Sequence, residues 1–189
     1  MCAKIGLLES AGFTLIETLV AISLLTVAIV APMSLTAQSL ASAYYARDQI
    51  TASYLAQEAI EAVRSVRDGN ILLNSQGTQV DLLSYNGNSL VSMSPFTIDT
   101  RNNAITLCPS NGCPALETDG NFYGYGGGAS GWTTTQFTRS VSAILVGSGT
   151  DEVKISVVIT WRSGAFQERS FSIAEDLYRW VNDGSGAQG

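Results

Sequence analysis

The chain has 189 residues, enough for about one ordinary domain and an appended segment. Its formal net charge of −6 and its ten scattered basic residues argue against a nucleic-acid surface, because phosphate backbones are bound by clustered lysine and arginine. The absence of histidine excludes hydrolytic and zinc chemistry that depends on a histidine base or ligand.

The first predicted element is a membrane-spanning helix near the N-terminus. No charged residue occurs from Thr18 to Ala46, and the dense apolar part of this region reaches the roughly 20 residues that a helix needs to span a bilayer. We therefore predict a transmembrane segment at about residues 13–37. Before it, Lys4 and the free amine outweigh Glu9, so the positive-inside rule places this end in the cytoplasm.

Two ordinary interpretations compete for this segment. A secretory signal peptide would be cleaved near the small residues of "QSLASA", but the length of the apolar run and the carboxylate within it argue against cleavage there. A plain single-pass anchor explains the length. It gives no reason for Glu17, since a carboxylate in hydrocarbon is costly unless it has a partner or a task.

The stretch "GFTLIETLVAI" resembles the cleavage and methylation motif of type IV prepilins and type II secretion pseudopilins. In that family a membrane aspartyl peptidase cuts after the glycine and methylates the new amino terminus. The resemblance implies a leader peptide at residues 1–12, cleavage between Gly12 and Phe13, and N-methylation of Phe13. Pro32 falls earlier than in many pilins and should kink the span, a defect that neighbouring helices can cover.

The same resemblance suggests a task for Glu17, the fifth residue of the mature chain. A helical rise places its carboxylate about 6 Å along the axis from the new amine, which is still positively charged at neutral pH. A neighbouring subunit that enters a filament with an axial stagger can bring its amine to this carboxylate, so Glu17 would fix the assembly register. Alternatively, Glu17 is an acid at a helix N-terminus that the helix dipole favours.

Beyond the span, we predict that the helix continues over residues 13–68, about 84 Å at 1.5 Å per residue. Gly69 is expected to end it at a C-cap position. An apolar stripe on its second half, which requires a surface to pack on, recurs at three- and four-residue steps: Leu55, Ala59, Ala62, Val63 and Val66.

Residues 69–131 are rich in Gly, Asn, Ser and Thr, and we predict a variable loop region with one or two short strands. Within it, "CPSNGCP" brings Cys108 and Cys113 together, and in an oxidising compartment the pair could close a small disulfide loop. Two free thiols are the alternative. Cys2 lies in the predicted leader.

Two candidate ligand sites in this region are weak. "FYGYGGGASG" contains a GxGxxG spacing, but it leads into a β-like segment rather than a helix, so no dinucleotide site is predicted. Glu117, Asp119 and Asn121 could offer oxygen atoms to calcium, but their spacing does not match an EF-hand loop. We predict no metal, no cofactor and no enzymatic activity.

The C-terminal part is predicted to be an antiparallel β-meander over residues 132–178, followed by a flexible tail at 182–189. In its middle run, Val153 to Trp161 alternate apolar and polar side chains, as in a half-buried strand. One apolar face would cover the helix stripe, giving an α+β head. With the long N-terminal helix, this is the lollipop outline that the resemblance to pilins implies.

The sequence therefore predicts a structural subunit, most like a minor pilin or pseudopilin, of a type IV pilus or type II secretion pseudopilus. The implied partners are the prepilin peptidase, other major and minor pilins or pseudopilins, the platform membrane protein and, indirectly, the assembly ATPase. The precursor would be a single-pass protein of the cytoplasmic membrane with an outer head, later assembled at the cell surface. The alternative is a membrane-anchored binding domain that never polymerises.

Overall fold

A computed structural model describes residues 12–147, 152–163 and 167–178, which fall into two compact units divided between Tyr45 and Ala46. Helix α1 (Leu15–Ser75) begins in the first unit and ends in the second. We call the second unit the head. The predicted leader, except for Gly12, and the predicted tail at 182–189 lie outside the described residues.

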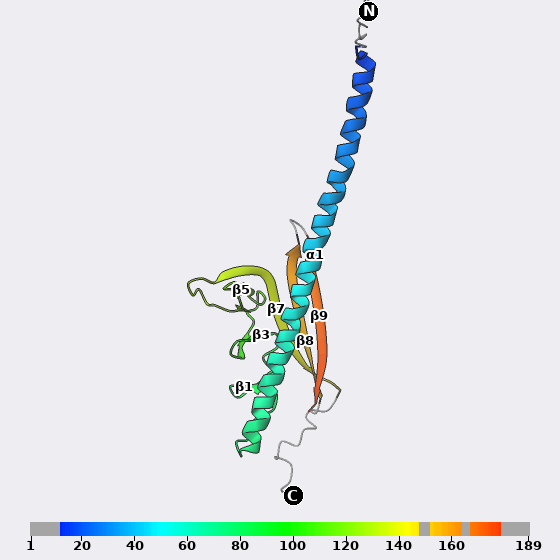
Figure 1. Cartoon of the computed structure of the whole chain (residues 1–189). Helices are drawn as coiled ribbons and strands as arrows, with labels where there is room; N and C mark the ends of the chain where they lie inside the picture. Colours follow the sequence, from blue (N-terminus) through cyan, green and yellow to red (C-terminus); the bar gives the residue numbers. More distant parts are fainter. Residues whose placement is uncertain (1–11, 148–151, 164–166, 179–189) are drawn as a thin grey trace, which may run out of the picture. The chain divides into compact units, whose positions relative to one another are not determined.

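The head combines the C-terminal part of α1 with an antiparallel sheet, so the predicted α+β class is confirmed. In Figure 1, β7, β8 and β9 lie alongside this part of α1. The strands, in chain order, are β1 (Ser84–Tyr85), β2 (Asn88–Ser89), β3 (Phe96–Asp99), β4 (Ala104–Leu107), β5 (Ala115–Thr118), β6 (Tyr123–Gly124), β7 (Thr133–Leu145), β8 (Glu152–Ser163) and β9 (Gln167–Tyr178).

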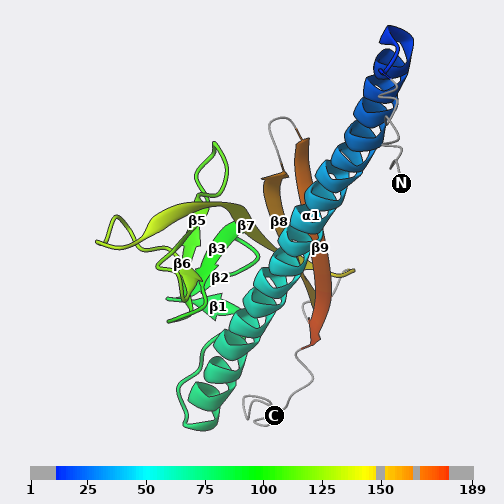
Figure 2. The same cartoon turned by 45° about the horizontal axis from the view of Figure 1, so that its top comes forward.

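Strand β7 joins the two parts of the main sheet. Along one edge it pairs with β8, which in turn pairs with β9 over the full length of that strand. Along its other edge it pairs first with β5 and then, at Val141, with β3. Figure 2 shows the result: β1–β6 lie to one side of α1, whereas β7, β8 and β9 cross behind the helix.

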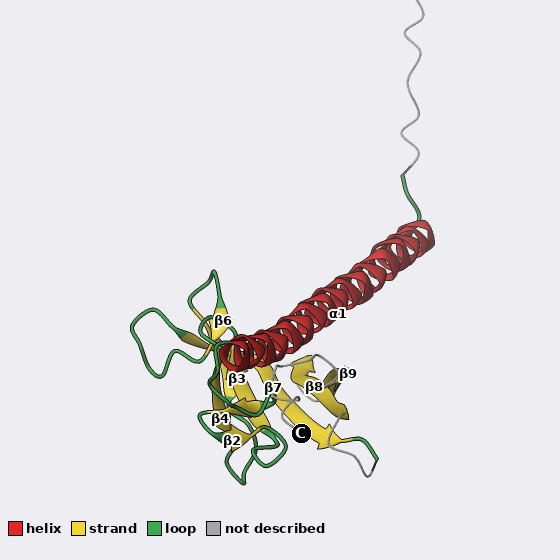
Figure 3. Cartoon of the chain, turned by 90° about the horizontal axis from the view of Figure 1, so that it is seen from below, coloured by secondary structure: helices red, strands yellow, loops and turns green. Residues whose placement is uncertain are grey.

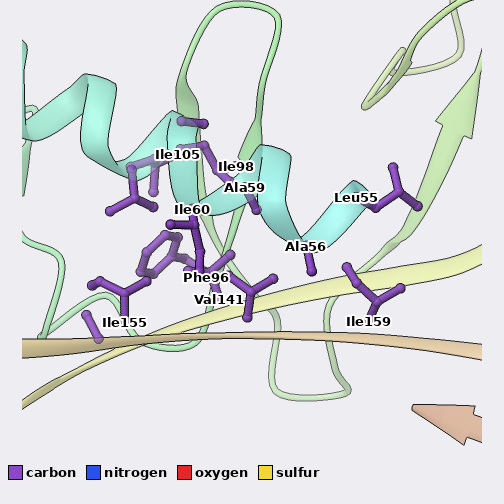
Figure 4. Close-up of a cluster of buried hydrophobic side chains, with 14 of the residues drawn as sticks. Leu55, Ala56, Ala59, Ile60, Phe96, Ile98, Ile105, Val141, Ile155 and Ile159 are labelled. Carbon is purple, nitrogen blue, oxygen red and sulfur yellow. The ribbon is translucent and has the colours of Figure 1, made fainter. Parts of the chain in front are cut away.

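The core lies between the buried stripe of α1 and the inner face of this sheet. Ala52, Ala56 and Ala59 are fully buried, and their small side chains allow the helix to approach the strands closely. In Figure 4, Ala56, Ala59 and Ile60 face Phe96 and the strand residues around it. The apolar residues of β8 contribute as their alternation predicted, each at 3% exposure or less: Val153, Ile155, Val157, Ile159 and Trp161.

The predicted end of the helix was wrong. Gly69 lies inside α1, which continues to Ser75, and the glycine at the C′ position is Gly77, whose φ is +88°. The amide of Gly77 donates to the carbonyl of Asn74 at 2.9 Å, and that of Thr78 donates to Leu73 at 3.0 Å, the two bonds of a Schellman motif.

Tertiary contacts explain why the helix passes Gly69, where glycine disfavours a helix by only about 1 kcal/mol. The side-chain amide of Asn70 donates hydrogen bonds to the backbone carbonyls of Asp81, Leu82 and Ser84 at 2.9–3.1 Å. Asn74, one turn later, exchanges two hydrogen bonds with the backbone of Val80. The following segment is therefore fastened to the last two turns of the helix.

The region 69–131 is more ordered than predicted. Its first seven residues are helical, and it contains β1–β6, of which β3 and β5 pair directly with β7. Most of its loops gather around β2, β4 and β6 in Figure 3. Short strands of two to four residues carry too little periodicity to be recognised in a sequence, so their long-range partner β7 decides their structure.

Candidate functional site

The start of α1 is a capped helix terminus built from the "TLIE" stretch. Thr14 precedes the helix, and its hydroxyl accepts a hydrogen bond from the amide of Glu17 at 3.3 Å. The spacing is that of a capping box, in which the N-cap threonine is followed three residues later by glutamate. Thr14 is a functional residue that the sequence analysis missed, although the S/T-x-x-E pattern was available to find it.

Gly12 and Phe13 lie immediately before this cap, outside the helix. The Phe13 side chain is 80% exposed. A Cβ added at Gly12 would meet no atom within 4 Å, and Gly12 has no left-handed φ, so the fold itself does not require glycine at this position. Recognition by a molecule that binds this segment would explain the glycine.

The surface of the helix in the first unit is almost entirely apolar and exposed, as at Leu15, Leu24 and Met33. By length and composition, α1 is sufficient to cross a membrane. The hydroxyls along it donate to carbonyls of the same helix at 2.7–2.8 Å, so they add little polarity that a bilayer would have to accommodate: Thr18, Ser23, Thr26 and Thr36.

Two polar features interrupt this apolar surface. Glu17 is exposed, and its carboxylate forms no hydrogen bond or ion pair with any residue that the structure describes. Pro32 lies inside the helix and has no amide hydrogen, so the carbonyl of Ala28 cannot receive its usual bond. Both features leave a polar group that a partner outside this unit could satisfy.

The comparison with protein families decides what this segment is. Residues 9–31 match the model of the prokaryotic N-terminal methylation motif. The match supports a type IV pilin-like precursor. No curated protein and no solved structure matches the chain. The motif points to a structural protein rather than to an enzyme, and with the long apolar helix it suits a membrane-anchored precursor.

The head contains a buried arginine that joins three elements. Arg139 of β7 is 0% exposed, and its guanidinium donates to the carbonyl of Leu55 in α1 at 3.3 Å and to that of Ile98 in β3. One of its terminal nitrogens also lies 3.7 Å from a carboxylate oxygen of Glu58. The charge of Arg139 therefore holds the helix, β3 and β7 together in the centre of the head.

A second polar cluster organises the glycine-rich loop of the head. Asp99 forms an ion pair with Arg101, and the guanidinium of Arg101 lies 4.3 Å from the ring centre of Trp132. A Cβ at Gly124 would lie 2.6 Å from the Nε of Arg101, and one at Gly126 would lie 2.4 Å from the Trp132 ring. These glycines are present because the stacked Arg101 and Trp132 leave no room for a side chain.

Asp99 gives the head a specific pH dependence. Burial opposes the charge of its carboxyl, but hydrogen bonds from the Arg101 side chain and from the amides of Arg101 and Tyr125 outweigh that effect and lower the pKa of Asp99. A lowered pKa means that the charged form adds stability above the ordinary carboxyl value of about 4, which is lost as the pH falls through the folded value.

We expect the Asp99→Asn variant to lose this contribution. The difference in unfolding free energy between the wild-type chain and the variant should be largest at neutral pH and should shrink as the pH falls below about 4. Urea titrations at pH 7 and pH 3 measure that difference. A difference in unfolding free energy that stays constant, or that increases at low pH, would contradict the lowered pKa of Asp99. Asp68→Asn, at an exposed carboxylate of α1, is the matched control.

The other residues singled out in the head have structural positions. Cys108 and Cys113 form a disulfide that closes the polar loop between β4 and β5. The carboxylate of Asp119 accepts hydrogen bonds from the backbone amides of Asn121 and Phe122, both at 2.8 Å, and so stabilises the β5–β6 turn. Among the described residues, no group of three or more acidic, cysteine or histidine side chains could hold a metal ion.

Proposed function

We propose that the protein is a subunit of a type IV pilus or type II secretion pseudopilus, of the minor pilin or pseudopilin kind. Prepilin peptidase would cut between Gly12 and Phe13 and methylate the amine of Phe13. The apolar half of α1 would then pass from the membrane into the filament shaft. The platform membrane protein, other pilins and, indirectly, an assembly ATPase are the partners that this process requires.

The observation that supports the proposal is the order of three features at the start of α1. A glycine that the fold does not require, an exposed phenylalanine and a carboxylate without a partner among the described residues follow one another at the border of an exposed apolar helix. Each needs a binding partner, and peptidase recognition followed by helix packing would supply one for all of them.

The rival function is a membrane-anchored head that never polymerises. The same apolar helix supports it, because α1 meets the length and composition of a span irrespective of what happens afterwards. It leaves Gly12 without a purpose and Glu17 with only the favourable interaction of an acid with the helix dipole. The preference for a minor subunit rests on the sequence of the helix and the three-stranded meander, which look more like those of minor components.

The test is the intact mass and N-terminal sequence of the protein from the membrane fraction of its native host. We expect a mature chain that begins at Phe13 and carries one added methyl group, because both modifications are made at that residue. A chain that still begins at Met1 would support the plain anchor. A chain that begins near Ala41 or Tyr44 would identify a secreted protein and overturn the proposal.

A further inference from the structure

A groove on the exposed side of α1 in the head is lined by side chains that attract a positive charge. Its volume is about 550 Å³, within the range of ordinary binding sites. Its lining includes two tyrosines, Tyr54 of α1 and Tyr123 of β6, and two carboxylates on successive turns of the helix, Glu58 and Glu61. Aromatic faces and carboxylates both attract cations.

The two carboxylates are only partly used within the head. The Glu58 side chain is 47% exposed, with one oxygen accepting the hydroxyl of Thr100 at 2.7 Å and the other lying 3.7 Å from Arg139. The Glu61 side chain is 65% exposed and pairs with Arg64. A carboxylate offers about four acceptor positions, so each of these can accept another donor from outside.

The same helix face carries a cation without a partner. Arg47 is exposed, and its guanidinium forms no ion pair or hydrogen bond with any residue in the described parts of the chain. At 100° per residue, its position falls with those of the groove within an arc of about 80°: Arg47, Thr51, Tyr54, Glu58 and Glu61. It lies about 16 Å along the axis from Glu58 and about 21 Å from Glu61.

We propose that the occupant of this groove is the Arg47 side chain of a second copy of the chain, displaced along the helix axis by about 16–21 Å and rotated about that axis so that the two helix faces oppose each other. Its guanidinium would lie between the rings of Tyr54 and Tyr123 and donate to Glu58 and Glu61. The inference rests on the proposed function, because it needs chains that assemble. Two successive copies suffice, so it holds for a minor as well as for an abundant subunit.

The arrangement is suited to a polymer rather than to a closed dimer. The donor at Arg47 and the acceptor groove are different patches of one chain, and both lie along one helix with a fixed offset. Such a heterologous contact repeats from copy to copy and generates an open helical filament when it does not close into a ring. The complementary charges also select the axial register.

The test is thiol crosslinking in assembled filaments of the native host, with the full-length chain carrying Arg47→Cys and Glu61→Cys together. Cys108 and Cys113 are already joined, and Cys2 lies in the predicted leader, so the introduced thiols are the reactive pair of the mature chain. A short bismaleimide should produce a ladder of covalent multimers, of which the first step, the dimer, is all that two successive copies can give. The matched control, Arg47→Cys with Asp68→Cys, places the second thiol outside the groove and should give none.

Charge reversal provides a second measurement. Arg47→Glu should lower the amount of this chain in sheared filaments at least tenfold, and adding Glu61→Arg should restore most of it. Filaments that contain the double-cysteine chain without any ladder, or that crosslink it only to a different protein, would overturn the inference alone. A wild-type chain that never enters filaments would overturn the proposed function and this inference with it.

Discussion

Replacing Glu17 by alanine should abolish incorporation into filaments while leaving cleavage after Gly12 intact. The carboxylate has no partner among the described residues and begins an otherwise apolar helix surface. In a filament core its counterpart would be the methylated amine of a neighbouring copy. Loss of one member of a buried ion pair costs about 3–5 kcal/mol, so assembly should fall by a hundredfold or more.

Two fractions of the same cells measure this effect: the sheared filaments and the membranes. The membranes should contain the Glu17→Ala chain at its normal abundance and with Phe13 as its first residue, whereas the filaments should lack it. Thr18→Ala is the control, because the Thr18 hydroxyl already donates to the carbonyl of Leu15 at 2.8 Å. Undiminished incorporation of the Glu17→Ala chain would show that the carboxylate does not set the register.

Some parts of this protein could be predicted because local chemistry decides them. Strand β8 alternates between apolar and polar residues except at Val158, and the structure buries Val153, Ile155 and Val157 as expected. The motif around Gly12 is similarly local, since the peptidase would recognise a continuous stretch of chain. In both places a short segment contains all the information that its structure or recognition needs.

Other parts depend on partners far away in the sequence. Gly69 is a residue type that often ends helices. The side chain of Asn70 nevertheless forms hydrogen bonds with residues 81–84, and the helix continues past Gly69. Gly124 and Gly126 suggest a flexible loop, but the positions of Arg101 and Trp132 require them. Neither outcome can be derived from adjacent residues, because the hydrogen bonds of Asn70 span 11 residues or more and Arg101 lies 23 residues before Gly124.

Arg139 is the clearest example of such a long-range residue, and its removal should have the largest effect on the stability of the head. The alternation of β7 places Arg139 on the inner face of the sheet, between Phe137 and Val141, where the sequence gives no sign of a partner. Its partners come from two other elements, Leu55 of α1 and Ile98 of β3. A fully buried arginine is tolerated only when such acceptors are in place.

We expect Arg139→Ala to lower the free energy of unfolding by about 3–5 kcal/mol, because it leaves a large cavity and removes the charged hydrogen bonds. Arg139→Met, which keeps most of the volume, should cost about 1–3 kcal/mol, since only the hydrogen bonds are lost. Glu58→Gln should change stability by less than about 1 kcal/mol, because the Glu58 side chain is half exposed and its interaction with Arg139 is screened by water.

Urea unfolding of the full chain in a mild detergent, followed by tryptophan fluorescence, to which the buried Trp161 contributes, measures the order of these three variants. The predicted order separates packing from charge, because the alanine and methionine variants lose the same hydrogen bonds and differ in the space they leave. A methionine variant as stable as the wild type would mean that desolvating the guanidinium offsets its hydrogen bonds. In that case Arg139 would determine which elements meet in the head without adding to its stability.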